Sequence, residues 1–383
     1  MPAASRRRIA SAEADYVIVG AGSAGSVVAA RLASAGASVI VVEAGGTDRR
    51  PDVKLAPGVM TLYRSANWKY PTLADPTKDG ERPPFAAGRI VGGSGAINAM
   101  VYVRGRAGDY DCWAEAGCTG WSYDDVLPTF KAIESWAGGA DDFRGGAGPI
   151  HVEWCGHDHE IDRAFVDAAT QAGYLRNPDP NGRDQLGVAR AQVNRRRGIR
   201  SHSGREFLRA APRGSRPVLL TRTTVTGIRL DGRRAVGVET TAGLIRARQE
   251  VILAAGAIGS PGLLLRSGIG PDGSRHRLNG VGTNFQDHLV VTQRWSSKVP
   301  TLNTIGPISA ATAAADFLWN RTGPIATSPF EAQLLTDDFQ IAVGPVQYQV
   351  GQGDRKDIPG TSRWFHRLYG PAAPAGTRPR RPP

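Results

Sequence analysis

The chain has 383 residues, of which 41% are hydrophobic and 21% are charged, a composition that excludes a disordered protein and indicates a globular one. Its length predicts one large domain or two intertwined domains. The formal net charge of +12 is concentrated in three short clusters without interleaved aromatic side chains, at 6–8, 195–197 and 378–381, so we expect no nucleic-acid partner.

The same sequence argues against a membrane or extracellular protein. No apolar run approaches the ~18 residues that a membrane helix needs, so we expect no integral membrane segment. The arginines at 6–8 are not followed by the apolar stretch of a secretion signal. Cys112, Cys118 and Cys155 form no CxxC pair, which favours a reducing compartment and argues against a disulfide framework or a zinc site. We therefore expect a cytoplasmic location.

Residues 15–43 have the order of a dinucleotide-binding unit. The β-branched run 15–19 predicts a buried parallel strand, and Gly20-Ala21-Gly22-Ser23-Ala24-Gly25 follows it directly. A helix is predicted over 26–35, and a second buried strand over 39–42 ends at Glu43. The complete order of strand, glycines, helix, strand and acid is a strong signal, whereas the glycines alone would be a weak one.

Each glycine in this motif has a separate expected role. Gly20 allows the tight turn, Gly22 lets the backbone approach the pyrophosphate, and Gly25 lets the helix pack closely on the strand. The phosphates would lie at the helix N-terminus, and Glu43 would accept hydrogen bonds from the adenosine ribose. An acid at this position disfavours a 2′-phosphate, but the motif does not separate NAD from FAD.

Residues 47–87 are rich in Pro, Asp and Arg and have little periodicity, so we expect a loop that covers the cofactor. Its aromatic residues Tyr63, Trp68 and Tyr70 are expected to pack within this lid rather than to contact a ligand. A second glycine-dense loop follows at 88–100, where Gly92, Gly93 and Gly95 permit close approach and Ser94 and Asn98 supply polar groups. By itself this loop predicts a cradle for a phosphate or a ring.

The middle of the chain contains two further patterns. Residues 216–253 predict a β-meander with a hairpin turn at Asp231-Gly232. After the buried strand at 250–253, Ser260 is expected to cap a short helix over 262–267, with Pro261 at its first position and Gly268 at its end. His157 and His159 lack a third ligand nearby in sequence, so we expect no metal site.

Taken together, these motifs resemble the glucose–methanol–choline (GMC) oxidoreductases. Residues 88–98 match the family's first signature, with Gly95 where Ser is more usual, and residues 256–270 match the second. The segment Gly280-Val281-Gly282-Thr283-Asn284-Phe285-Gln286-Asp287-His288 is similar to the one that follows it in the family. The resemblance covers about residues 14–350.

The resemblance implies FAD as the cofactor. In the family, the first glycine motif holds the pyrophosphate, the acid matching Glu43 binds the ribose, the loop matching 92–98 runs beside the flavin, and the backbone at Val225 meets the adenine. The second and third glycine motifs give no support to a classical NAD-dependent dehydrogenase. The cofactor-binding residues expected from this resemblance are Gly20, Gly22, Ser23, Ala24, Gly25, Glu43, Ala44, Arg89, Gly92, Gly93, Ser94, Asn98, Ala99, Val101 and Val225.

We expect an α/β fold in which a Rossmann-like FAD-binding domain with a β-meander is interleaved with an incomplete α+β substrate-binding domain. The FAD-binding domain is predicted over 12–150, with its lid at 47–87, and resumes over 216–290. The substrate domain is predicted over 151–215 and 291–358. An irregular, Pro- and Arg-rich tail is expected over 359–383.

The activity that the resemblance implies is oxidation of a small-molecule alcohol, as in choline dehydrogenases, with hydride transfer to flavin N5. The family's base is a histidine near the C-terminus, and neither His202, His288 nor His366 lies in a matching context, so we name no catalytic residue. The expectation is a truncated chain, and the alternative function is flavin binding without turnover. Choline, other primary alcohols and aromatic alcohols all stay open as substrates, as do the electron acceptor and the oligomeric state.

Overall fold

The structure is a computed structural model that describes residues 12–74, 79–80, 82, 84–211, 213–346 and 364–371. The chain forms two compact units that interleave along the sequence. The first unit comprises Met1–Val53, Thr61–Asn98 and His202–Phe285, and the second comprises Lys54–Met60, Ala99–Ser201 and Gln286–Pro383. The predicted FAD-binding domain differs from the first unit, because residues 99–150 pack within the second unit and 202–215 within the first. The basic clusters at 6–8 and 378–381 lie outside the described residues.

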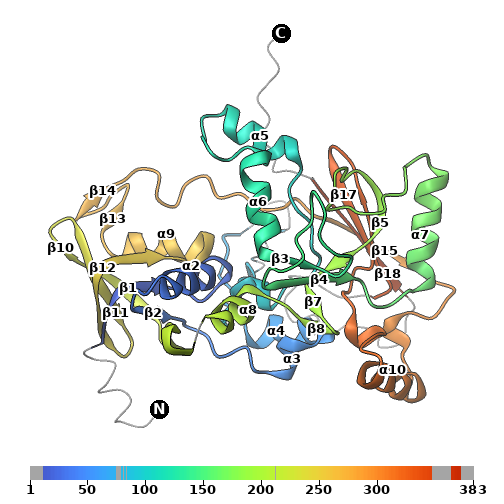
Figure 1. Ribbon diagram of the computed structural model, residues 1–383, viewed down its shortest axis with the longest axis horizontal. Coiled ribbons are helices and arrows are strands. Elements are labelled where there is room, and N and C mark those ends of the chain that lie inside the picture. The colour runs from blue at the N-terminus through green and yellow to red at the C-terminus, as the bar shows by residue number, and fades with distance from the viewer. Residues whose placement is uncertain are drawn as a thin grey trace. The chain divides into compact units, whose positions relative to one another are not determined.

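The first unit is built on a six-stranded sheet with a parallel half and an antiparallel half (Figure 1). The strands are β1 (Glu13–Val19), β2 (Val39–Val42), β9 (Val218–Leu220), β10 (Val225–Asp231), β11 (Arg234–Thr240) and β12 (Gly243–Leu253), in the order β10-β11-β12-β1-β2-β9. The predicted meander is confirmed for β10 to β12, which are antiparallel, whereas β9 pairs in parallel with β2 at the other edge. The α/β class is thereby confirmed.

Small side chains allow the first helix to pack closely on this sheet. Helix α2 (Ser23–Ser34) places Ala29 and Ala33 against Ile18 and Val41, all of which are buried. It begins three residues before the predicted start at 26 because the helical backbone starts directly after Gly22. Burial on both faces explains why the strands β1 and β2 are runs of Val and Ile rather than alternating sequences.

The remaining elements of the first unit correct two predictions. Residues 47–87, predicted as a loop, contain helices. The helix predicted over 262–267 is longer than predicted, because α9 (Gly256–Arg266) starts at Gly256 and has Pro261 inside it. Ser260 does not cap this helix from its first position; its hydroxyl accepts a hydrogen bond from the N–H of Ala255, which precedes the helix. The remaining elements of the first unit are η3 (Gly93–Ala96), α8 (Ser203–Ala210), η4 (Arg213–Ser215), α9, β13 (Ile269–Gly270) and β14 (His276–Arg277). The short helices α3 (Pro51–Lys54), η1 (Ala56–Gly58) and α4 (Val59–Ser65) include residues of the segment Lys54–Met60, which belongs to the second unit.

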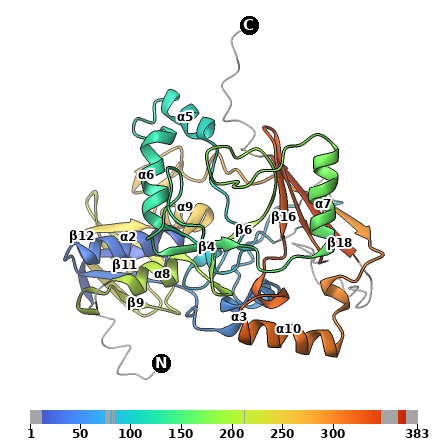
Figure 2. The same cartoon turned by 45° about the vertical axis from the view of Figure 1, so that its right-hand side comes forward.

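The second unit contains a five-stranded antiparallel sheet. Its strands are β5 (Gly187–Arg190), β15 (Val291–Ser296), β16 (Ala332–Leu335), β17 (Phe339–Gly344) and β18 (Trp364–Pro371), in the order β15-β18-β17-β16-β5. Helix α7 (Glu160–Gln171) covers this sheet with apolar side chains (Figure 2). The prediction of an irregular tail over 359–383 is wrong at β18, because its backbone pairs with β15 on one side and β17 on the other.

Smaller elements complete the second unit. A three-stranded sheet joins β3 (Glu134–Trp136), β4 (Ile150–Trp154) and β6 (Gln192–Val193), and β7 (Arg195–Arg196) pairs with β8 (Ile199–Arg200). The helices of this unit besides α7 are α5 (Ala107–Glu115), α6 (Tyr123–Ile133), η5 (Leu302–Thr304), α10 (Pro307–Trp319) and η6 (Pro324–Ala326).

A buried ionic network ties these smaller elements together. Glu134 at the start of β3 accepts hydrogen bonds from Arg104 Nη2 at 2.7 Å and from Arg144 Nη2 at 2.8 Å. Arg144 also pairs with Asp179 at 2.6 Å, and its guanidinium lies 4.2 Å from the ring centre of Trp136. The side chains of Glu134 and Arg144 are 0% exposed, so each charge is stabilised by its charged partners rather than by water.

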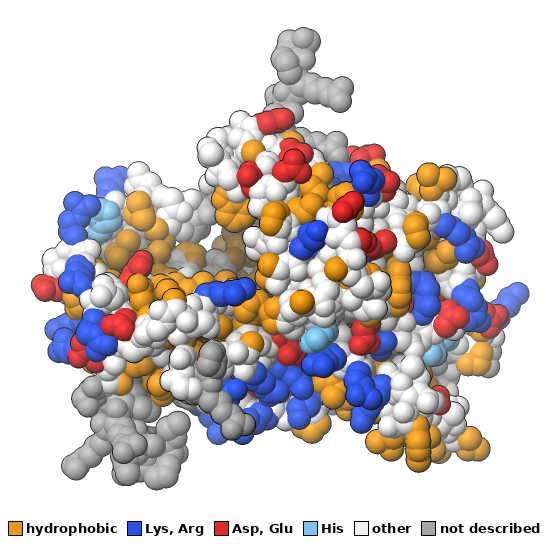
Figure 3. Space-filling view, in the orientation of Figure 1, with side chains coloured by type: hydrophobic (Ala, Val, Ile, Leu, Met, Phe, Trp, Pro, Cys, Tyr) orange, Lys and Arg blue, Asp and Glu red, His pale blue; other side chains and the backbone are white. Residues whose placement is uncertain are grey.

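Within the described ranges, no helix is both long enough and apolar enough to cross a membrane. On the face shown in Figure 3, Lys and Arg side chains are interspersed with Asp and Glu. Hydrophobic side chains gather over α10, where Ile308, Leu318 and Trp319 are 85%, 62% and 79% exposed (Figure 3).

Candidate functional site

The first unit holds a cavity of about 920 Å³. It opens where the parallel strands β1, β2 and β12 end, at Val19, Val42 and Leu253. Ligands bind at this edge of open α/β sheets because the loops that follow the strands diverge there. The volume lies at the upper end of the roughly 300–1,000 Å³ typical of ligand pockets, which suits a large cofactor.

Three glycines shape the first wall of this cavity, and they do so for different reasons. Gly20 has φ +101°, and a Cβ at Gly25 would lie 2.0 Å from the carbonyl oxygen of Gly20. Both positions are therefore required by the fold itself. A Cβ at Gly22 would meet no protein atom closer than 3.9 Å, although Gly22 lines the cavity. Its missing side chain leaves room for a ligand rather than for protein.

Two helices begin at the cavity and direct their positive ends toward it. Gly22 precedes α2 and Ala255 precedes α9, and neither residue caps its helix with a side-chain hydrogen bond. The first N–H groups of a helix have no acceptor within the helix, and the helix dipole makes this end electropositive. Arg266, at the end of α9, also lines the cavity. This arrangement suits a ligand with negatively charged phosphates.

Glu43 supplies the carboxylate on the opposite side of the glycine turn. Its Oε2 accepts a hydrogen bond from the N–H of Ala21 at 3.0 Å, and its Oε1 accepts one from Gly45 at 2.7 Å. Burial raises the pKa of this carboxyl, and the two backbone hydrogen bonds oppose that shift. Because each carboxylate oxygen has a second lone pair, Glu43 can still accept hydrogen bonds from a ligand hydroxyl in the cavity.

The structure brings most of the predicted cofactor-binding residues to this cavity. Those that line it are Gly20, Gly22, Ser23, Ala24, Glu43, Ala44, Gly93, Ser94 and Val225. The predicted residues that do not line the cavity are Gly25, Arg89, Gly92, Asn98, Ala99 and Val101, of which the last two belong to the second unit. Among these, Gly25 packs against the backbone of the glycine turn, and the guanidinium of Arg89 lies 4.7 Å from the ring centre of Trp68.

Two aromatic residues, which the sequence predicts to pack within the lid, also form part of the cavity lining. Trp68 and Tyr70 both line the cavity, with their rings stacked at 5.5 Å and an angle of 8° between the planes. Antiparallel backbone bridges pair Asn67 with Gly88 and Tyr70 with Phe85, so this segment lies beside the start of the second glycine loop. These pairings join residues 21 and 15 positions apart without a regular strand pattern, so sequence periodicity could not reveal them. Burial also raises the pKa of the Tyr70 hydroxyl.

Further lining residues come from the segments 223–226 and 254–266, which includes the start of α9. In the sequence, the second glycine signature indicates α9. The cofactor-binding residues expected from the sequence nevertheless include no residue of this helix, although several of its residues line the cavity. No histidine of the described chain lines this cavity. His202 lies 3.6 Å from Asp48, and His288 donates its backbone N–H to the side chain of Asp287.

The second unit contains a separate pair of buried carboxyl groups. Asp162 on α7 and Glu331 before β16 are 4% and 1% exposed. His157 Nδ1 lies 3.1 Å from Glu331 Oε1. Burial, reinforced by the negative charge of Glu331, raises the pKa of Asp162 to about 9, so Asp162 is protonated at neutral pH.

This raised pKa predicts that the folded protein loses stability as the pH rises. The unfolded chain ionises Asp162 near its usual pKa of 3.8, whereas the folded chain keeps the proton up to about 9. Unfolding therefore releases a proton between these values, and the free energy of unfolding falls with pH in that window. The neutral variant Asp162→Asn is expected to raise the free energy of unfolding at about pH 8 by more than about 1 kcal/mol.

Urea denaturation of both proteins from about pH 5 to about pH 8.5 measures this effect. The gain from Asp162→Asn should shrink toward pH 5, because keeping the wild-type group protonated in the folded state costs less free energy as the pH approaches the unfolded pKa of 3.8. The exposed Asp167, paired with Arg176, provides the matched control Asp167→Asn, which should show no such trend. An equal gain at all pH values would contradict the assignment.

The comparisons with known proteins agree with this geometry. The sequence model of the GMC oxidoreductase family matches residues 14–290. The chain is 38% identical over 339 residues to an oxygen-dependent choline dehydrogenase of Photobacterium profundum, covering 83% of this chain and 59% of the relative. It is 39% identical over 356 residues to the one of Brucella anthropi, covering 88% of this chain and 64% of the relative.

Solved structures give the same result for the fold. A pyridoxine 4-oxidase from Mesorbium loti is similar with a TM-score of 0.79 and 29% identity, over 93% of this chain and 71% of that one. A formate oxidase from Aspergillus oryzae, whose FAD is modified, is similar with a TM-score of 0.82 and 22% identity, over 94% of this chain and 73% of that one.

The chain thus spans about 60% of the length of the curated relatives that it matches. The family model nevertheless covers the first unit from residue 14 onward, through α9 and including both glycine loops. The prediction of FAD as cofactor is confirmed at the level of the family alone. On this match, the chain belongs to the GMC oxidoreductase family.

Proposed function

We propose that the first unit binds FAD in its cavity and that the protein oxidises the CH–OH group of a small-molecule alcohol. The observation that carries the proposal is the cavity at the uncapped start of α2, which Gly22 leaves open and Glu43 borders. The start of α2 would hold the pyrophosphate, and Glu43 would hold the adenosine ribose. Val225, on β10, would border the adenine, and Ser94 would lie beside the remainder of the cofactor.

Bound FAD would accept a hydride from the carbinol carbon of the alcohol at flavin N5. The chain's own residues would bind and orient the cofactor and limit the access of water to it. Trp68 and Tyr70 are suited to this last task, because their stacked rings form an apolar wall of the cavity. The small-molecule alcohol as substrate is supported by the choline dehydrogenases among the relatives.

The absorption spectrum of the purified chain tests the proposal directly. We expect oxidised-flavin bands in the protein as purified or after addition of FAD and removal of the excess. Anaerobic addition of a primary alcohol should then bleach those bands, because the flavin takes up the hydride. A folded, soluble protein that retains no flavin under either condition would contradict the proposal.

A second candidate function is flavin binding without turnover. It is favoured by the lining of the cavity, in which the described residues include no histidine that could take the hydroxyl proton. The same experiment separates the two functions. Flavin bands that persist with every alcohol tested, while dithionite still bleaches them, would support this second function.

We also propose that the protein works in the cytoplasm. Cys112, Cys118 and Cys155 are all unpaired, as is usual where the thiols are kept reduced. Fractionation of the producing cells, with immunodetection of the chain, would test this location.

A further inference from the structure

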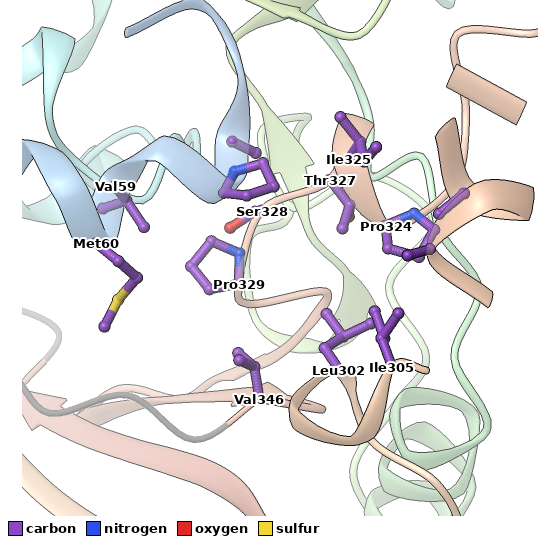
Figure 4. Close-up of a pocket in the computed structure, with 14 residues that line it drawn as sticks. Val59, Met60, Leu302, Ile305, Pro324, Ile325, Thr327, Ser328, Pro329 and Val346 are labelled. Atoms are coloured by element: carbon purple, nitrogen blue, oxygen red, sulfur yellow. The ribbon is translucent and has the colours of Figure 1, made fainter. Parts of the chain in front are cut away.

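Two cavities of the described chain differ in the groups that they present to a ligand. The smaller one, of about 290 Å³ in the second unit, is lined mainly by aliphatic side chains such as Val59 and Leu302 (Figure 4). The larger one, in the first unit, is also lined by Tyr70 and by the charged Arg266. The sequence predicts neither of these two as a cofactor-binding residue.

One face of α9 forms a wall of the larger cavity. Gly259, Gly262, Leu263 and Arg266 line it, and their spacing of three or four residues places them on the same side of the helix. A Cβ at Gly259 would lie 3.5 Å from the Tyr70 hydroxyl, and a Cβ at Gly262 would lie 3.4 Å from Nη1 of Arg266. The hydroxyl and the guanidinium therefore lie over adjacent turns of one helix face.

The backbone beside Arg266 is fixed to strand β10. The hydroxyl of the buried Ser267 donates to the carbonyl of Leu263 at 2.7 Å and accepts the N–H of Ile228 at 2.9 Å. Ile228 belongs to β10, whose Val225 lines the same cavity and would border the adenine. Arg266 is thereby held at the end of the cavity that the adenine would occupy.

The Tyr70 ring is held by stacking. It stacks on Trp68, and the guanidinium of Arg89 lies over the Trp68 ring. Burial raises the pKa of the Tyr70 hydroxyl most, the charges of Arg266 and Arg89 oppose this rise, and the charge of Glu43 adds to it. The hydroxyl stays protonated at neutral pH and lies within electrostatic range of both Arg266 and the proposed ribose ligand Glu43.

The position along α9 separates this end of the cavity from the proposed phosphate site. The segment before α9 lies beside Gly22, since a Cβ at Gly22 would lie 4.0 Å from the carbonyl oxygen of Ala254. Gly262 follows Gly256, the first residue of α9, by six positions, which is about 9 Å along the helix axis. The Arg266 guanidinium over Gly262 thus lies where a nucleoside would extend from the pyrophosphate toward β10.

We propose that Arg266 and Tyr70 position the adenosine of FAD and make the site selective for FAD over FMN, which lacks the adenosine. The planar guanidinium of Arg266 stacks on the adenine ring, and the Tyr70 hydroxyl donates a hydrogen bond to the adenosine ribose. Both are positioning residues and take no part in hydride transfer. The proposal rests on the proposed function, because it concerns the same cofactor site.

Calorimetric titration of the flavin-free full chain with FAD and with FMN tests the role of Arg266. Arg266→Ala should weaken FAD binding about tenfold and leave FMN binding unchanged. Arg266→Lys should not restore the affinity, because an ammonium group keeps the charge but has no plane that can stack. The matched control is Arg229→Ala, because Arg229 is an exposed arginine of β10 that does not line the cavity.

Tyr70→Phe tests the hydroxyl separately, because it keeps the ring that stacks on Trp68. It should weaken FAD binding about 3- to 10-fold and leave FMN binding unchanged. Its control is Tyr16→Phe, because Tyr16 lies on β1 of the same unit and does not line the cavity. Thermal denaturation of each variant verifies that it is folded.

The proposal is overturned if Arg266→Ala or Arg266→Lys binds FAD as tightly as the wild type, or if FAD and FMN lose affinity equally. Titration with AMP keeps this result separate from the proposed function. A wild-type chain that binds AMP in an Arg266-dependent way but binds no flavin would refute the flavoprotein and support the adenosine site. Binding of FAD that does not depend on Arg266 would refute only the role of Arg266. A chain that binds neither AMP nor FAD would refute both.

Discussion

The variant Gly22→Val is expected to fold normally and to lose FAD. The backbone of Gly22 has φ −73° and ψ −164°, which an L-residue adopts without strain, and a Cβ there would meet no protein atom closer than 3.9 Å. The added side chain would instead project where the proposed pyrophosphate approaches the start of α2. An overlap of this kind costs about 1–3 kcal/mol, which weakens FAD binding about 5- to 150-fold.

Titration of the flavin-free chain with FAD, followed by absorption, measures this loss, and thermal denaturation verifies the fold. Gly280→Val is the matched control, because a Cβ at Gly280 meets nothing within 4 Å and this glycine does not line the cavity. The control should bind FAD as the wild type does. Equal affinity of Gly22→Val and the wild type would place the pyrophosphate elsewhere.

The variant Glu134→Gln is expected to destabilise the second unit by about 3–5 kcal/mol. The wild-type carboxylate accepts hydrogen bonds from Arg104 and from two nitrogens of Arg144, and all three side chains are almost fully buried. The amide of Gln keeps the shape but removes the charge, and its NH₂ group can only donate. Two arginines would then stay buried with less negative charge to balance them.

Urea denaturation followed by tryptophan fluorescence reports this change, since Trp136 packs against Arg144. The matched control is Glu239→Gln in the first unit. Its partner Arg229 lies 3.4 Å away, and the two side chains are 53% and 58% exposed, so the change should be below about 1 kcal/mol. If the two variants lose similar stability, the buried network does not hold the second unit together.

The motif at 15–43 could be read from the sequence because its constraints are local. Gly20, Gly25 and Glu43 lie within one strand–helix–strand unit, where each position follows from the geometry of a short connection. The same holds for the meander over β10 to β12, whose hairpin signals are adjacent in sequence.

Features that depend on distant pairing were not accessible in this way. Strand β18 exists because β15 and β17 accept its backbone on both sides, although the sequence around it has the composition of a loop. Trp68 and Tyr70 reach the cavity only through bridges to Gly88 and Phe85.

The sequence by itself therefore determined the family and, through it, the expected cofactor, together with the first wall of the cavity in which we propose that FAD binds. Only the tertiary structure decided the burial of Asp162 beside Glu331 and the apolar cavity between Met60, Leu302 and α10. The physical reason is the range of the interactions. Turn geometry and helix starts are set by neighbouring residues, whereas burial, pKa shifts and cavity shape arise from side chains that only the folded chain brings together.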